Sequence, residues 1–326
     1  MSKYSIVHLT RYVYPSDVTD SANQFILSPK SDDMQQILKH QISVIPNVNI
    51  DVFSDYFGNE VGVFTLVGPH RSLEIRADME VVTFASTEPI AEISVVEQWA
   101  DLELKKWEFP YIDFLYLENI NCKAEVNAIF DDYVVKEMHI VDVVRMLSTY
   151  IYTNFTYRQG VTTVESTVDE IWKLRAGVCQ DFAHLLITML RMQDIPSRYI
   201  SGYICPSNSE MRGEGATHAW VEVYIPSIGW RGIDPTNNCW VSDRHIKIAY
   251  GRDFKDCTPV KGTYKGPSAH TLGVSVIITN ENTKEKTADP IEPAYVSVTT
   301  DEQVEKSNLY QRYLETQQQQ QQQQQQ

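Results

Sequence analysis

The first part of the chain, residues 1–90, alternates between apolar and polar positions over short runs. In residues 4–10 the even positions form one set of side chains and the odd positions another, which is the period of a β-strand. Residues 51–56 and 61–67 continue the pattern on either side of Gly58-Asn59, a dipeptide typical of a hairpin turn. We therefore predict a small antiparallel β domain with the character of a β-sandwich.

Beyond this region the pattern favours helices. Residues 97–107 and 134–152 are rich in helix-compatible residues, and the aromatic segment 109–121 between them is interpreted as a connection. The second stretch has one apolar face at helical spacing, formed by Met138, Val141, Val144, Met146 and Leu147. We predict a helical connection over residues 91–135, followed by a core over residues 136–280.

Residues 167–195 predict a short helix, a break and a second helix. The short helix covers residues 168–174, and the second begins at Cys179 and is ended by Pro196. The apolar side chains of the second helix recur at i, i+3, i+4, i+7 and i+8, and they are Phe182, Leu185, Leu186, Met189 and Leu190. Cys179 is therefore expected at a helix N-terminus, shortly after Gly177.

A β-hairpin is predicted further along. After a glycine-rich loop around residues 213–215, two runs with strand character, 218–224 and 230–236, are joined by a tight turn. His218 and Asp234 are 16 positions apart in the sequence. Because paired strands bring such residues face to face, we expect these two side chains to lie close together at the open end of the hairpin.

Composition places the chain among ordinary globular proteins. It has 326 residues, of which 43% are hydrophobic and 22% are charged, so about two domains are expected. The net charge of −15 argues against nucleic acid or an anionic membrane as the main partner, since phosphate groups bind to basic surfaces. Residues 281–326 are polar and end in an unbroken glutamine run over 317–326. Because this tail has no apolar face to bury, we predict that it stays outside the fold.

The cysteines and the N-terminus bear on the cellular compartment. Five cysteines are widely spaced without a CxxC pair, which excludes zinc-ribbon and thioredoxin motifs. Free thiols in a reducing compartment are therefore expected. The first residues show no signal peptide, and no stretch approaches the roughly 18 apolar residues of a membrane span. We predict a soluble, cytoplasmic protein.

The position of Cys179 at a helix N-terminus has chemical consequences. The positive end of the helix dipole and the unpaired amides of the first turn stabilise a thiolate there. The same amides can receive an oxyanion, because they have no partner within the helix. The alternative is that Cys179 is simply a small buried apolar residue, as many free cysteines are.

His218 and Asp234 supply what a nucleophilic cysteine needs. A carboxylate beside a histidine fixes the tautomer of the ring and stabilises its imidazolium form, and a thiol beside that imidazole can become a thiolate. In this interpretation Cys179 attacks a carbonyl, His218 transfers the proton and Asp234 orients His218. The alternatives are a structural histidine on a strand and an aspartate that starts a turn before proline.

Two other polar residues of the second helix are assigned structural roles. His184 competes with His218 as the base, but it lies five residues after Cys179 and therefore on a different face of the helix. We interpret it as a packing residue or an indirect polar contact. Asp181 is most simply a first-turn carboxylate favoured by the helix dipole.

Four sequence blocks resemble the transglutaminase-like superfamily of cysteine enzymes, specifically its bacterial branch. The blocks are residues 177–184, 198–203, 217–223 and 229–236. The start of the chain and residues 251–262 are similar to this branch as well, so the resemblance covers residues 1–280. One departure is the block at residues 25–29, which lacks the arginines usual in the branch.

The resemblance implies a papain-like α+β core, in which a helix bearing the cysteine packs on an antiparallel sheet bearing the histidine and the acid. By position, Cys179 matches the family's nucleophile, His218 its histidine and Asp234 its acid. The shared chemistry is a thioester acyl-enzyme formed from an amide. Attack by water then gives a hydrolase, either a cysteine peptidase or an amidase, and attack by an amine gives a protein-glutamine gamma-glutamyltransferase.

We expect hydrolysis of an amide or peptide bond in a peptide or protein substrate. Crosslinking or amine transfer, acyl transfer from a small donor and a non-catalytic binding module of the same fold stay as alternatives. A second donor for the oxyanion or substrate is needed, and Gln180, Tyr203 and Trp220 are candidates by nearness in sequence, with core packing as the alternative for the aromatic rings. No cofactor or metal is expected, since no calcium loop is recognisable. The sequence leaves the oligomeric state and the role of the N-terminal domain open.

Overall fold

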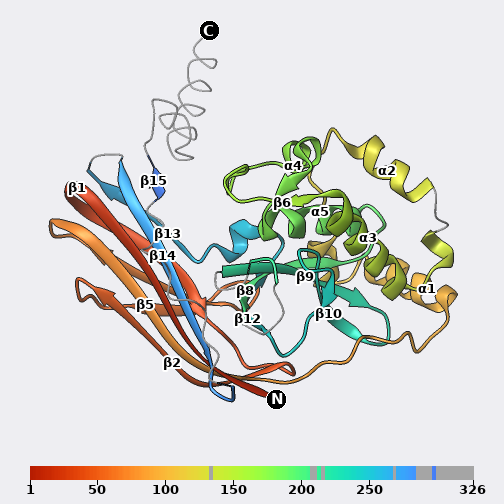
Figure 1. The fold of residues 1–326 in the computed structure, drawn as a ribbon, viewed down its shortest axis with the longest axis horizontal. Helices are drawn as coiled ribbons and strands as arrows, with labels where there is room; N and C mark the ends of the chain where they lie inside the picture. The colour runs from red at the N-terminus through yellow and green to blue at the C-terminus, as the bar shows by residue number, and fades with distance from the viewer. Residues whose placement is uncertain (132–134, 206–210, 214–216, 267–268, 284–295, 299–326) are drawn as a thin grey trace, which may run out of the picture.

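The computed structural model describes residues 1–131, 135–205, 211–213, 217–266, 269–283 and 296–298, and it has a mixed α+β architecture (Figure 1). An antiparallel β domain lies beside a core of helices and a second antiparallel sheet. The predicted fold class is therefore confirmed. No helix in the described part of the chain is long and apolar enough to cross a membrane.

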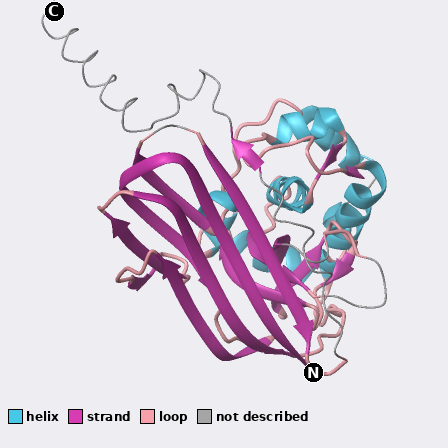
Figure 2. Ribbon diagram, turned by 60° about the vertical axis from the view of Figure 1, so that its left-hand side comes forward, coloured by secondary structure: helices cyan, strands magenta, loops and turns pink. Residues whose placement is uncertain are grey.

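The N-terminal sheet is organised around one long strand, β1 (Ser2–Ser28). The first half of β1 lies between β5 (His70–Thr83) and β14 (His270–Asn280). The second half lies between β4 (Glu60–Leu66) and β13 (Val260–Lys265). β1 therefore links the two portions of the sheet, and Figure 2 shows the long antiparallel strands on one side of the molecule and the helices on the other.

Local patterning explains most of this domain. The even positions at the start of β1 are buried, as their alternation predicts. β2 (Gln35–Ile45) extends the sheet beyond β5, and β3 (Asp51–Ser54) pairs with β4 through the predicted hairpin. Gly58 has a φ of 80° in this hairpin, a conformation that glycine adopts without strain.

The C-terminal boundary of the core differs from the predicted one. Residues 260–280 were expected within the core over 136–280, but β13 and β14 pair with β1 and complete the N-terminal sheet. A hydrophobic period of two residues identifies a strand but not the strand that it pairs with, so the sequence pattern could not show that residues 260–280 return to the N-terminal sheet. β15 (Val296–Val298), from the predicted tail, also pairs with β14. The rest of the tail beyond residue 283, including the glutamine run, lies outside the described residues.

The helical elements agree with the predicted ones at most positions. The α-helices are α1 (Val95–Lys105), α2 (Lys123–Asp131), α3 (Ile140–Asn154), α4 (Val168–Leu174) and α5 (Cys179–Arg191). The short 3-10 helices are η1 (Tyr111–Phe114), η2 (Val135–Glu137) and η3 (Phe254–Cys257). The helix predicted over 134–152 begins later, at α3, because His139 is its N-cap and η2 precedes it. Residue 134 lies outside the described residues.

The second sheet carries the predicted hairpin at its centre. Its strands are β8 (Ser197–Ile204), β9 (Thr217–Ile225), β10 (Gly229–Asp234), β11 (Cys239–Trp240) and β12 (His245–Gly251). They are antiparallel in the order β11-β10-β9-β8-β12. β6 (Thr156–Tyr157) and β7 (Ala176–Gly177) form a separate parallel pair.

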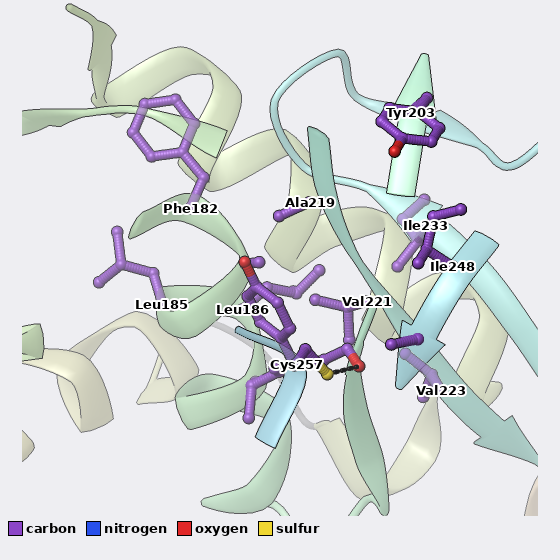
Figure 3. Close-up of a cluster of buried hydrophobic side chains, with 14 of the residues drawn as sticks. Phe182, Leu185, Leu186, Tyr203, Ala219, Val221, Val223, Ile233, Ile248 and Cys257 are labelled. Carbon is purple, nitrogen blue, oxygen red and sulfur yellow. Dashed lines mark hydrogen bonds between the residues drawn. The ribbon is translucent and has the colours of Figure 1, made fainter. Parts of the chain in front are cut away.

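Helix α5 packs on this sheet through the apolar face that its spacing predicts. Figure 3 shows the side chains of α5 in one buried cluster with those of β9, and the labelled members include Phe182, Leu185, Leu186, Ala219, Val221 and Val223. This contact fixes the start of α5 relative to β9 and β10. All five cysteines are free thiols.

Candidate active site

Local sequence places Cys179 at the first position of α5. The preceding helix α4 is capped by Thr167 and ends at Arg175, which has a left-handed φ of 51°. The chain then passes through Gly177, where an added Cβ would lie 2.5 Å from Asp181 Oδ2, so a larger residue would displace that carboxylate. This change of chain direction between α4 and α5 leaves Cys179 partly exposed at the N-terminus of α5.

The side chain of Asp181 holds the segment before Cys179 in place. Its Oδ2 accepts hydrogen bonds from the Val178 amide at 2.7 Å and from Thr162 Oγ1 at 2.6 Å. Burial raises the pKa of Asp181, and these two hydrogen bonds oppose the shift. Asp181 thus caps the helix, while helix geometry leaves the amides of Cys179 and Gln180 without an intrahelical acceptor.

The hairpin of β9 and β10 brings His218 and Asp234 together. Val221 pairs with Ile233 in this hairpin, which places the two polar residues at its open end. His218 Nε2 lies 2.8 Å from Asp234 Oδ2, and both side chains are fully buried. The sequence spacing therefore identified a real contact between these residues.

The pKa of His218 depends on both Asp234 and Cys179. Burial opposes the charged form of His218, but the attraction of Asp234 and the contact with the Cys179 thiol outweigh it and raise the pKa of the imidazole. In the same way, His218 outweighs burial and holds the pKa of Asp234 well below its usual range. His218 Nδ1 is buried and makes no hydrogen bond of ordinary geometry with the described residues. Since Nε2 is engaged by Asp234, Nδ1 is the ring nitrogen that is free to exchange a proton with the Cys179 thiol.

Asp234 has further partners that sequence reasoning did not name. Its Oδ1 accepts hydrogen bonds from the amides of Thr236 at 2.9 Å and Asn237 at 3.3 Å. Its Oδ2 accepts one from Asn237 Nδ2 at 2.7 Å and lies 3.4 Å from His245 Nε2. The run Asp-Pro-Thr-Asn is a recognisable signal for such an Asx turn, whereas nothing in the sequence around His245 pointed to Asp234.

The group formed by His218, Asp234 and His245 could gather a metal ion by geometry alone, since its ligand atoms lie within 4.8 Å of one another. The tautomer of His245 argues for a different role. His245 Nδ1 accepts a hydrogen bond from the Ser242 amide at 3.3 Å, so the proton of the neutral ring is on Nε2. Burial lowers the pKa of His245 and favours this neutral form. His245 is thus a hydrogen-bond donor to Asp234.

Tyr157 and Gly213 are two further residues beside His218. An added Cβ at Gly213, where φ is 80°, would lie 2.9 Å from His218 Nδ1 and 3.5 Å from the Tyr157 hydroxyl. Burial and the neighbouring Cys179 raise the pKa of Tyr157. Sequence reasoning missed Tyr157, which lies in the short strand β6 far from the motif blocks. Of the predicted glycine-rich loop, residues 214 and 215 lie outside the described residues.

The three candidate donors, Gln180, Tyr203 and Trp220, have different surroundings in the structure. Gln180 donates from Nε2 to the Val164 carbonyl at 3.3 Å, so its side chain is held by the preceding loop. The Tyr203 hydroxyl, a candidate by nearness in sequence, lies 2.7 Å from His8 Nδ1 in a buried contact with the N-terminal domain. Trp220 is buried beside His218, with the two ring centroids 6.3 Å apart.

His184 has the packing role expected of it. Its Nε2 accepts a hydrogen bond from the Phe254 amide at 3.2 Å, and its ring lies against Tyr199. Burial lowers the pKa of His184 to about 4. A neutral ring tied to η3 cannot replace His218 as the partner of Asp234.

Comparisons with known proteins agree with this arrangement. Residues 128–235 match the profile of the transglutaminase-like superfamily, and residues 4–82 match that of the bacterial transglutaminase-like N-terminal region. The chain is 31% identical over 283 residues to an uncharacterized protein of Mycobacterium leprae, covering 86% of this chain and 99% of the relative.

Two more comparisons bear on fold and chemistry. A crystal structure of a candidate cysteine protease from Cytophaga hutchinsonii superposes with a TM-score of 0.67 at 21% identity, covering 91% of this chain and 96% of that one. This likeness shows a shared fold. A protein-glutamine gamma-glutamyltransferase of Pseudomonas aeruginosa is 30% identical over 90 residues, which are 25% of this chain and 13% of that protein.

Proposed function

Because the chain belongs to the transglutaminase-like superfamily, we propose that it is a thiol enzyme that hydrolyses amide or peptide bonds through Cys179, His218 and Asp234. The observation that carries the proposal is the state of His218. Its Nε2 is engaged by a buried carboxylate, while its buried Nδ1 is left without a conventional partner next to a thiol. Buried polar atoms are nearly always hydrogen-bonded, and an unpaired ring nitrogen beside a thiol is able to accept the thiol proton.

The first half of the reaction follows from this geometry. His218 Nδ1 takes the proton of Cys179, and the thiolate attacks the carbonyl carbon of the substrate to form a C–S bond. The oxyanion that develops is received by the free amides at the start of α5. The C–N bond then breaks, and the amine leaves with the proton carried by His218. The product is a thioester on Cys179.

The second half regenerates the thiol. A nucleophile gives its proton to His218 and attacks the thioester carbonyl, and the C–S bond breaks. With water the product is a carboxylic acid, and with a primary amine it is a new amide. Hydrolysis is proposed because water reaches any open thioester, whereas amine transfer also requires a site that admits amine and excludes water.

Amine transfer is the second candidate, supported by the partial match to a named gamma-glutamyltransferase. Asp234 serves both reactions equally, since it stabilises the imidazolium that forms in each half. The two candidates therefore share one machine and differ only in the acceptor. The proposed substrate in either case is a peptide or protein.

One experiment separates these outcomes. The protein is incubated with a glutamine-containing casein digest and a labelled primary amine, and both ammonia and peptide masses are measured, with Cys179→Ala as control. We expect new cleavage or deamidation without incorporated amine, and its loss in the variant. Incorporation that depends on Cys179 would assign amine transfer instead. Identical products from both proteins would contradict the thiol mechanism.

A further inference from the structure

The outer strand of the core sheet is completed by side chains of the N-terminal domain. β12 lies at the edge of the sheet order, so one side of its backbone has no strand partner within that sheet. Gln35 on β2 accepts a hydrogen bond from the Lys247 amide and donates one to the Lys247 carbonyl, both at 2.8 Å. Asn59 does the same with Tyr250, at 3.0 and 2.8 Å.

These contacts imitate the pairing of a neighbouring strand. A carboxamide has the same donor and acceptor as a peptide group, so each side chain replaces one residue of a missing strand. Gln35 and Asn59 are only 2% and 3% exposed, which makes each unmade bond costly. The N-terminal domain therefore holds β12 at two points along its length.

The turn before β12 is held as well. Thr83 Oγ1 donates to the Asp243 carbonyl at 2.5 Å, and Ser2 Oγ donates to Asp243 Oδ2 at 2.8 Å. Both donors come from the ends of long strands of the N-terminal sheet. Because Ser242 in this turn donates its amide to His245 Nδ1, the turn also fixes the tautomer of His245.

His245 is the first residue of β12, and it joins these contacts to the active site. Its Nε2 lies 3.4 Å from Asp234 Oδ2, and its ring packs edge-on against Trp220 with centroids 5.3 Å apart. The charged and titratable groups that face it are Asp234, His218 and Arg244. A shift of β12 would move this donor away from the carboxylate that orients His218.

We propose that His245 is a positioning residue for Asp234, and that the N-terminal domain holds it in register by completing the edge of β12 through Gln35 and Asn59. This inference rests on the proposed triad and deepens it. It assigns the N-terminal domain a working part in the active site through the backbone of one strand. The substrate does not touch His245 in this account.

Thiol labelling tests the proposal without any substrate. The rate of alkylation of Cys179 by iodoacetamide is measured against pH and assigned by peptide mass, with Cys239, which is partly exposed like Cys179, as an internal reference. At about pH 5.5 an ordinary thiol is ionised to only about one part in a thousand, so rapid labelling there reports the thiolate paired with His218. In a variant that fails to fold, the buried cysteines, such as Cys257, would be alkylated much faster than in the wild type.

Two substitutions of His245 separate its two hydrogen bonds. His245→Gln keeps a donor that can reach Asp234. The shorter side chain of His245→Asn can still accept from the Ser242 amide, but its NH₂ group does not extend to Asp234. We expect Cys179 of the Asn variant to be alkylated about tenfold more slowly at acidic pH, and that of the Gln variant to retain most of the rate. The size of the effect is taken from metal sites, where removing the hydrogen-bond partner of a ligand side chain lowers affinity or activity about 10- to 100-fold. Equal rates for the wild type and His245→Asn, or equal losses in both variants, would overturn the positioning role.

A second pair tests the N-terminal domain and does not depend on His245 variants folding. Gln35→Met removes both bonds to Lys247, and Gln36→Met makes the same change at the exposed neighbouring position. We expect slower labelling of Cys179 in the first variant only. Equal rates in the two variants would overturn the link through β12. If wild-type Cys179 labels no faster than Cys239, the triad itself fails; if labelling responds as expected but no amide is cleaved, only the proposed hydrolysis fails.

Discussion

Two charged clusters lie along β9, a fully buried one around Asp234 and a partly exposed one around Glu222. In the second cluster, Arg198 and Lys247 each bind one oxygen of the Glu222 carboxylate. Lys247 also contacts Asp32 at 2.7 Å, so each charge has an opposite partner. In the first cluster the oxygens of Asp234 are equally well occupied, but His218 Nδ1 is left open beside Cys179.

The difference shows how a structural cluster can be told from a reactive one. Buried polar atoms are nearly always hydrogen-bonded, so a cluster with every atom paired has no capacity to move a proton. A single unpaired ring nitrogen next to a thiol does have that capacity. Substitutions in the Asp234 cluster should therefore affect reactivity, and those in the Glu222 cluster should affect stability.

The largest expected effect is on turnover. Asp234→Asn keeps the shape of the side chain but removes the charge that stabilises the His218 imidazolium, so we expect kcat to fall by about 10⁴-fold. The matched change Glu222→Gln should leave kcat near that of the wild type. Turnover of the casein digest measures both, and similar losses in the two variants would erase the distinction between the clusters.

The next effect is on stability, and here we expect the substitution in the Glu222 cluster to have a clear effect. Glu222→Gln leaves Arg198 and Lys247 without their shared counter-charge, and breaking a largely buried pair in this way costs about 3 kcal/mol. Unfolding by urea, followed by circular dichroism, measures the loss. A Glu222→Gln protein as stable as the wild type would mean that this network does not hold the sheet together.

The pH dependence of stability sharpens the same contrast. Burial opposes ionisation of Glu222, but Arg198 and Lys247 outweigh it and lower the pKa of Glu222 to about 2. Its stabilisation is therefore present above the unfolded pKa of about 4.3 and is lost as the pH falls toward 2. We expect the free energy of unfolding to decline through this window in the wild type and less steeply in Glu222→Gln. Parallel curves would assign the acid sensitivity to other carboxylates.

The smallest effect comes from the backbone beside His218. Gly213→Ala places a Cβ 2.9 Å from His218 Nδ1, and we expect Cys179 to label about tenfold more slowly, since a displacement of about 1 Å can cost up to about 100-fold. Gly160→Ala is the control, because Gly160 has a similar φ of 76° with nothing within 4 Å of the added atom. Equal labelling in the two variants would show that the approach of Gly213 to His218 has no consequence.

Sequence reasoning succeeded where the physical signal is local. The start of α5 at Cys179 follows from helical spacing and a preceding glycine, and the hairpin contact between His218 and Asp234 follows from a fixed number of residues between two strands. Each signal involves residues that are near one another along the chain. Local patterns of this kind survive folding because tertiary contacts do not override them.

Sequence reasoning failed where the contact is long-range. β14 pairs with β1 across nearly the whole chain, and no period can name such a partner. Tyr157 and His245 reach the site from strands whose own patterns are ordinary. Nearness in sequence makes Tyr203 a candidate donor, but its hydroxyl contacts His8. Asn237 could have been predicted, because an aspartate commonly binds amides two and three residues further on.

The central claim is that Cys179, His218 and Asp234 act as one unit, and the reactivity of Cys179 tests it most directly. Alkylation at about pH 5.5, where an ordinary thiol is almost fully protonated, is compared between Cys179 and Cys239 in the wild type and in His218→Ala. We predict rapid labelling of Cys179 in the wild type, slow labelling of Cys239, and loss of the difference in His218→Ala. Slow labelling of Cys179 in the wild type, or rapid labelling that survives without His218, would contradict the claim.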